Sequence, residues 1–182
     1  MGKQYNEIQP DQQEFIINQK IFFVGTAAST GRINISPKGM DTFRIVDSNK
    51  VVWLNLTGSG NETAAHLLKN DRMTIMFCAF EGKPKILRLY GKSRIYHKRD
   101  IAFSKYVGLF PEIPGSRQII EMDIDLVQTS CGFAVPFMDF RKERPQLRSW
   151  AEKKGEEKIQ TYWEERNSRS IDGLETGILG DG

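Results

Sequence analysis

Short apolar stretches, separated by turn residues, make up most of the chain as far as residue 130. Many are rich in β-branched residues and alternate between apolar and polar positions, the pattern of strands with one buried face. We expect strands at 21–28, 32–36, 42–46, 51–56, 72–80, 85–96 and 117–130. Tight turns such as Ser29-Thr30-Gly31 join them. Short strands with few helices predict a mainly β domain, either a small barrel or a sandwich.

Helical spacing of apolar residues occurs in three short segments, 10–20, 63–70 and 100–110. From Arg141 onward the apolar residues become sparse and lie on a heavily charged helical pattern. We therefore divide the chain into a β-barrel domain at 1–140 and a charged C-terminal helix and tail at 141–182. The second part is expected to pack on the barrel or on a dimer partner.

The composition is that of one globular domain: 182 residues, 39% hydrophobic, with a net charge of +3. Both signs of charge are mixed along the chain, which argues against nucleic-acid binding. The polar start lacks a signal peptide, and no apolar run has membrane-spanning length, so neither export nor membrane binding is expected. Cys78 and Cys131 form no metal or disulfide pattern, which favours reduced thiols in the cytoplasm. His97 is expected at the surface, and His66 at the surface or in a capping role, with contact to a ligand as the alternative; no metal site is predicted.

The stretch LTGSGNETAAHL at 56–67 links a predicted strand to a predicted helix through glycines and hydroxyls. Such a loop can hold a phosphate, because its backbone N–H groups are accessible and its side chains are small. It matches neither a Walker A loop nor the dinucleotide fingerprint. The alternative is a helix start capped by Asn61 or Ser59, and the two interpretations are compatible. Glu62 suits a helix start but opposes a phosphate placed very close to it.

GRINISPKG at 31–39, the stretch at 56–67 and ILRLYGKSRIY at 86–96 stand in the same order in a known family. With FCAFEG at 77–82 and QTSCG at 128–132, they make residues 12 to 128 resemble the pyridoxamine 5′-phosphate oxidase-like, FMN-binding split-barrel family. The resemblance implies a mainly β fold, a split β-barrel with flanking helices. It also implies a homodimer that binds FMN between subunits and reacts with a small-molecule redox partner.

Carried over by position, the resemblance implies three groups of cofactor-binding residues. Two groups would bind the phosphate and ribityl end: Ser36, Pro37, Lys38 and Gly39, then Ser59, Gly60, Asn61, Glu62 and Thr63. Arg88 would assist there, unless it forms an ion pair with Glu62 or Asp41. The third group would approach from the partner chain: Gln128, Thr129, Ser130 and Cys131.

The chain also departs from the authentic oxidases. Ser36 stands where they have an arginine, Asn61-Glu62-Thr63 replaces a Ser-Arg-Lys run, and Ile86 replaces a glutamine. We therefore expect an FMN-dependent oxidoreductase with another substrate, and no dedicated acid, base or nucleophile is recognisable. A non-catalytic flavin-holding or stress-response protein is the alternative. A third possibility is a flavin-free scaffold whose tail at 141–169 binds a partner. FMN and a deazaflavin are not distinguished.

Overall fold

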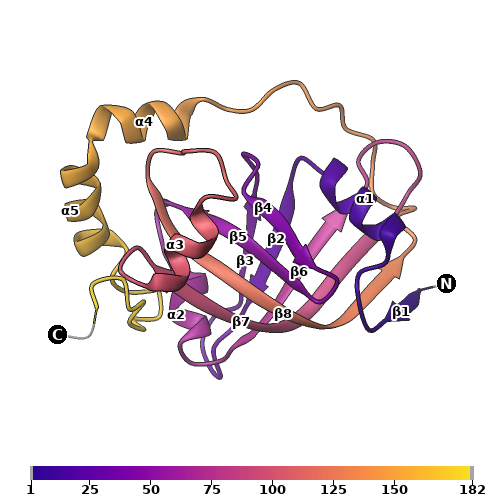
Figure 1. Cartoon of the computed structure of the whole chain (residues 1–182), viewed down its shortest axis with the longest axis horizontal. Helices are drawn as coiled ribbons and strands as arrows, with labels where there is room; N and C mark the ends of the chain where they lie inside the picture. Colours follow the sequence, from indigo (N-terminus) through magenta and orange to yellow (C-terminus); the bar gives the residue numbers. More distant parts are fainter. Residues whose placement is uncertain (1, 181–182) are drawn as a thin grey trace.

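The computed structural model describes residues 2–180. Met1 and residues 181–182, the outer ends of the two predicted parts, lie outside the described residues. In chain order the elements are β1 (Lys3–Tyr5), α1 (Pro10–Asn18), β2 (Phe22–Thr26), β3 (Asn34–Lys38), β4 (Phe43–Asp47), β5 (Lys50–Leu56), α2 (Glu62–Leu67), β6 (Arg72–Cys78), β7 (Ile86–His97), α3 (Ile101–Val107), β8 (Ser116–Ser130), α4 (Gln146–Lys154) and α5 (Glu156–Arg166) (Figure 1).

The strands form one antiparallel sheet in the order β3-β2-β6-β7-β8-β5-β4, and β1 pairs with β8. Four strands separate β2 from β4 in this order, yet the rings of Phe22 and Phe43 lie 5.1 Å apart. The sheet therefore curls until its two ends meet, and its inner face becomes the core of a barrel. Trp53, Phe77 and Leu87 fill that core and are almost completely buried. The predicted mainly β fold is confirmed.

A second, smaller core lies outside the barrel, where α3 covers β5 and β8. Strand side chains alternate between the two faces, so Val51 and Trp53 point into the barrel while Val52 and Leu54 point toward α3. Phe103 and Tyr106 of α3 pack on this outer face. Both faces of β5 are consequently buried, which explains why its sequence is a continuous apolar run.

Several local expectations were wrong. Pro37 lies inside β3 rather than ending it; β3 pairs only with β2, and an edge strand tolerates a residue without a backbone N–H. Both histidines are buried: His66 lies 3.1 Å from the Thr26 hydroxyl, and burial lowers the pKa of His97 to about 4. The predicted single C-terminal helix is two helices, separated at Gly155, whose φ is 75°.

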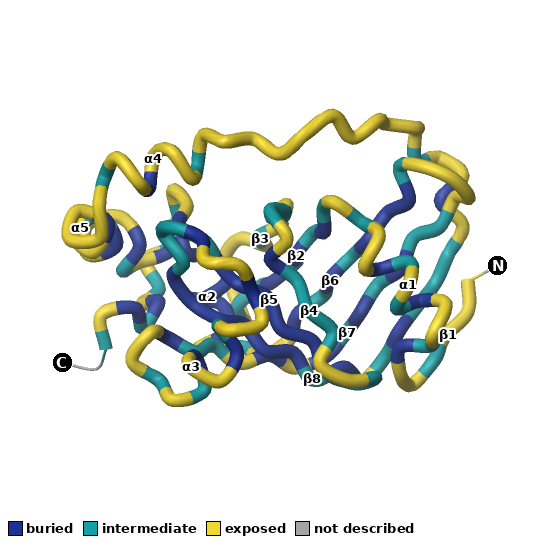
Figure 2. Tube along the Cα trace, turned by 45° about the horizontal axis from the view of Figure 1, so that its top comes forward, coloured by how far each residue is buried: buried dark blue, intermediate teal, exposed yellow. Residues whose placement is uncertain are grey.

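Residues 131–145, which we call the strap, contain no helix or strand and are mostly exposed. The strap starts at the end of β8, which pairs with the N-terminal strand β1, and crosses the molecule to α4 (Figures 1 and 2). Residues 156–180, the C-terminal segment, then lead back to the region of α2 (Figure 1). Within residues 2–180, no helix has the length and apolar character needed to cross a membrane.

Candidate cofactor site

A pocket with a volume of about 600 Å³ lies beside the glycine loop, residues 57–61. We call it the loop pocket. Its walls come from β3, β5, the glycine loop, the start of α2, the start of β8 and the end of α5. The side chains that define it are Ser36, Lys38, Asn55, Asn61, Thr63 and Arg117. β5 and β8 reach it with their ends, and β3 lines it along its length, so the pocket lies at the end of these two strands.

Four cations line the loop pocket, Lys38, Arg117, Arg166 and Arg169, and so do two carboxylates, Glu62 and Glu165. Lys38 and Arg117 are the two cations whose pKa is lowered. Burial lowers the pKa of Arg117 to about 9, and Arg117 is only 3% exposed. Burial also lowers the pKa of Lys38, to about 8, and repulsion from Arg117 adds to this effect. Neither forms an ion pair with any carboxylate of the described chain. Two partly or fully desolvated cations in one pocket, neither of them in an ion pair, favour an anionic ligand.

The loop pocket also contains buried polar atoms that have no hydrogen-bond partner. Six buried side-chain atoms in residues 2–180 lack a partner, and four belong to residues of this pocket: Ser36 Oγ, Asn55 Oδ1, Asn61 Oδ1 and Arg117 Nε. Buried polar groups are nearly always paired, and leaving one unpaired costs about 1–3 kcal/mol. The four atoms offer one donor, two acceptors and one hydroxyl that can do either.

The glycine loop does not cap α2 in the expected way. Asn61 occupies the N-cap position, but its side chain makes no capping hydrogen bond. Its Nδ2 atom instead donates to the carbonyl oxygen of Asn167, at 3.4 Å. The predicted capping role of Asn61 is therefore wrong, because the C-terminal segment offers this side chain another partner.

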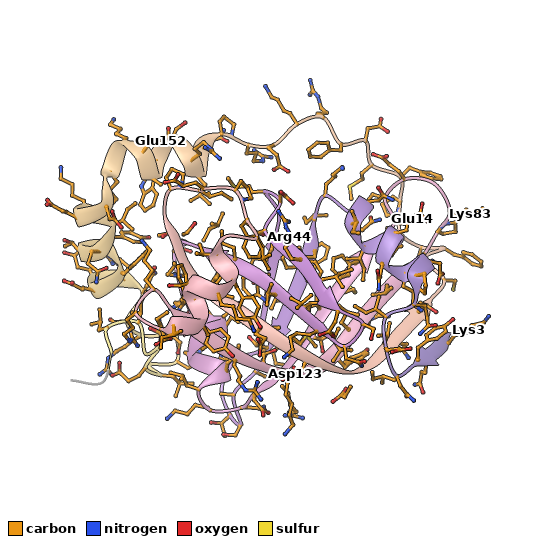
Figure 3. The ribbon with its side chains drawn as sticks, in the orientation of Figure 1. Lys3, Glu14, Arg44, Lys83, Asp123 and Glu152 are labelled. Atoms are coloured by element: carbon orange, nitrogen blue, oxygen red, sulfur yellow. The ribbon has the colours of Figure 1, made fainter. Side chains whose placement is uncertain are left out.

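Glu62 is occupied by the C-terminal segment as well. Its two carboxylate oxygens accept the N–H of Ile171, each at 3.1 Å. This carboxylate therefore has its partner within the chain. Neither Glu62 nor Asp41 binds Arg88; Asp41 instead pairs with Arg44 of β4 at 2.7 Å (Arg44 is labelled in Figure 3).

A larger pocket adjoins the first, and Lys38 lines both. Its volume is about 920 Å³, and it includes the predicted residues Pro37 and Gly39. Ile21, Phe23 and Phe80 give it apolar walls. Met138 and Phe140 of the strap line its other side, so we call it the strap pocket.

The remaining predicted residues lie elsewhere. Arg88 lines a separate hollow of about 500 Å³ and donates to the Ser130 hydroxyl at 3.2 Å. Gln128 accepts a hydrogen bond from the Tyr90 hydroxyl, and Cys131 is exposed. Within one chain the fold thus brings together Ser36, Lys38 and Ser59–Thr63, but not Arg88 or the group from Gln128 to Cys131.

Sequence reasoning missed Asn55, Arg117 and Asn167. Asn55 follows Val51 and Trp53 at alternate, core-facing positions of β5. An amide at the next such position could have been recognised in the sequence as a candidate site residue. Arg117 begins the strongly alternating stretch of β8, on the same face as Ile119, where a charge is equally unexpected. Asn167 carries no local signal, because its partners in the pocket, Arg117, Asn61 and Gly58, are 50 to 109 residues away along the chain.

Residues 8–131 match the family model described as pyridoxamine 5′-phosphate oxidase. The pyridoxamine 5′-phosphate oxidase family protein ustO of Aspergillus flavus is 36% identical over 190 aligned residues, covering 93% of this chain and 76% of that protein. Among solved structures, a candidate pyridoxamine 5′-phosphate oxidase from Lactobacillus delbrueckii has a TM-score of 0.55 at 15% identity, covering 68% of this chain and 94% of that one. HupZ of Group A Streptococcus has a TM-score of 0.51 at 20% identity, covering 65% and 91%. These structures share the fold, and the sequence matches show that the chain belongs to the pyridoxamine 5′-phosphate oxidase family.

Proposed function

We propose that the protein is an FMN-binding flavoprotein whose loop pocket holds the phosphate and ribityl chain. The observation that carries this proposal is that half-buried Lys38 and buried Arg117 share one pocket with polar atoms that have no hydrogen-bond partner. A phosphate supplies the missing negative charge and accepts hydrogen bonds from Arg117 Nε and Lys38 Nζ. The ribityl hydroxyls supply donors for the oxygens of Asn55 and Asn61. The residues present therefore fit a phosphorylated polyol.

The strap pocket is the proposed position of the flavin ring. It begins at Lys38, where the loop pocket ends, and its apolar walls suit a flat aromatic ring. FMN, when bound, supplies the redox chemistry. The residues of the chain orient the cofactor: Lys38 fixes the junction of the two pockets, and the strap excludes water from one side. We propose a small organic molecule as the redox partner. We also propose that the protein is cytoplasmic, which the free thiols of Cys78 and Cys131 support.

A homodimer is part of the proposal. Ile33 and Ile35, beside and on edge strand β3, are 74% and 71% exposed, and both line the hollow that contains Arg88. Exposed isoleucines on and beside an edge strand are typical of a surface that a second subunit covers. This arrangement would place Arg88 near the partner and give the residues around Gln128 a route to its cofactor.

The alternative is a flavin-holding protein without turnover. No histidine or cysteine is among the residues described as lining the loop and strap pockets. The groups there that can donate a proton are Lys38 and exposed carboxylic acids. The two candidates differ in one measurable property. An oxidoreductase lets its bound flavin be reduced by NADH or NADPH, with or without a reductase, whereas a holder keeps the flavin oxidised.

The test is a titration of the full-length protein with FMN and, separately, with riboflavin, followed by absorption and fluorescence. Riboflavin lacks the phosphate and is the matched ligand. We expect FMN to bind much more tightly than riboflavin. A protein that binds neither flavin, or binds both equally, would overturn the assignment of the loop pocket to a phosphate, and the flavin-free scaffold would then be favoured.

A further inference from the structure

The C-terminal segment closes one side of the loop pocket through contacts with the glycine loop. Trp163 Nε1 donates to the Thr57 hydroxyl at 2.8 Å, and the carboxylate of Asp172 forms an ion pair with Arg32. Arg99 donates to the carbonyl oxygens of Gly177 and Ile178, which fixes the far end of the segment. The family model ends at residue 131, so none of these tail residues belongs to the matched region.

Asn167 is the centre of these contacts and is completely buried. Its Oδ1 atom accepts a hydrogen bond from Arg117 Nη1 at 2.6 Å, and its Nδ2 atom donates to the Gly58 carbonyl at 3.2 Å. Its own carbonyl accepts from Asn61 Nδ2 at 3.4 Å and from the Thr176 hydroxyl at 2.6 Å. One side chain thus contacts both the buried cation and the loop that surround the pocket.

The chemistry of Asn167 matters as much as its position. Arg117 has one further acceptor, the carbonyl of Gly60 at 3.1 Å, and its Nε atom is unpaired. Both acceptors are neutral, so the guanidinium is held in place while its positive charge remains available. A carboxylate at position 167 would also hold the guanidinium, but it would cancel that charge locally.

We propose that Asn167 is a positioning residue that orients Arg117 toward the phosphate of the ligand, which makes the C-terminal segment part of the binding site of its own chain. This inference rests on the proposed function, since it takes the ligand to be FMN. It predicts that the identity of residue 167 controls the preference for a phosphorylated ligand, rather than flavin binding in general.

The test compares dissociation constants for FMN and riboflavin in three full-length variants. Asn167→Asp keeps the size of the side chain and adds a negative charge beside Arg117. Asn167→Ser carries the same test if the aspartate variant does not fold, because it shortens the side chain and removes its contact with Arg117. Trp163→Phe is the matched control: it removes a hydrogen bond of the same segment that does not involve Arg117.

We expect Asn167→Asp to weaken FMN binding by about tenfold or more and to leave riboflavin binding within about twofold, since the added carboxylate cancels the charge of Arg117 that attracts the phosphate. Trp163→Phe should keep the ratio of the two constants at its original value. An unchanged ratio in both Asn167 variants, or an equal change in Trp163→Phe, would overturn the proposal. If the unaltered protein itself fails to bind FMN, the proposed function falls instead, so the two failures are distinguishable.

Discussion

The Nζ atom of Lys38 lies 5.3 Å from the centroid of the Trp53 ring, above a side chain that belongs to the barrel core. A lysine in this position exchanges water for an aromatic face, which compensates its charge only in part. No carboxylate of residues 2–180 completes the compensation. The protonation of Lys38 should therefore depend on whether an anion occupies the loop pocket.

FMN binding should weaken as the pH rises through about 8. The pKa of Lys38 is lowered to about 8 in the free protein, and only its protonated form attracts a phosphate dianion. The sign for stability is opposite: the free protein becomes more stable across this range, because the unfolded chain still binds the proton that folded Lys38 has lost. Titrations with FMN from pH 6.5 to 9.5 test this expectation.

Lys38→Met should weaken FMN binding by roughly tenfold or more at neutral pH, as expected for loss of a charged contact. It should also remove the decline in FMN affinity near pH 8. Riboflavin binding should change little in the same variant. A decline that persists in Lys38→Met would assign the titration to another group.

Arg88→Gln should leave the FMN dissociation constant within about twofold of that of the unaltered protein if one chain forms the whole site. The reason is that Arg88 lines a different hollow from Lys38. Isothermal titration of the variant beside Lys38→Met checks this. Loss of binding together with loss of the dimer in Arg88→Gln would show that a second subunit carries the site. Loss of binding in an intact dimer would contradict our placement of the phosphate.

Gly91→Ala should destabilise the protein by about 2 kcal/mol or more, because overpacking against backbone cannot relax as a flexible side chain can. A Cβ atom on Gly91 would collide with the carbonyl of Asp123, at the point where the β7–β8 register shifts. Gly108→Ala is the control: its φ is −66°, and nothing lies within 4 Å of the added atom. Equal melting temperatures for the two variants would contradict this prediction.

Tyr106→Phe should cost about 1–3 kcal/mol, as a hydrogen bond to a buried charged group usually does. The Tyr106 hydroxyl donates to Glu121 at 2.5 Å, and burial raises the pKa of Tyr106, so the hydroxyl keeps its proton. Tyr96→Phe removes a longer contact with the same carboxylate, 3.3 Å, and should cost less. Denaturant unfolding of the two variants compares them, and a larger loss in Tyr96→Phe would exclude this explanation.

The order of the strands along the chain followed from local patterns. Alternation in β8 and the apolar run of β5 were recognisable because each strand packs against a core, and packing selects apolar residues at fixed intervals. The strand β1 was missed because Lys3–Tyr5 is short and polar, and only its pairing with β8 makes it a strand. The family resemblance, now confirmed, supplied the barrel that alternation alone left open.

The candidate site was predictable only in part. Lys38 and the glycine loop lie within recognisable motifs, whereas Arg117 belongs to the site because Asn167 and Gly60 hold it there. Such contacts between distant residues leave no periodic signal in the sequence. His66 and His97 show the same limit, since their burial follows from how α2 and β7 pack and not from their neighbours in the chain.

The strap joins the barrel to the helices that follow it and is mostly exposed. A protease should therefore cut the folded protein there first. Such a cut would break the covalent chain, yet Trp163, Asn167 and Asp172 would still join the two pieces. The two pieces on either side of the strap should therefore behave as complementary fragments of one fold. Produced separately, the barrel and the helical fragment should reassemble on mixing. Absorption and fluorescence of added FMN would detect the reassembly.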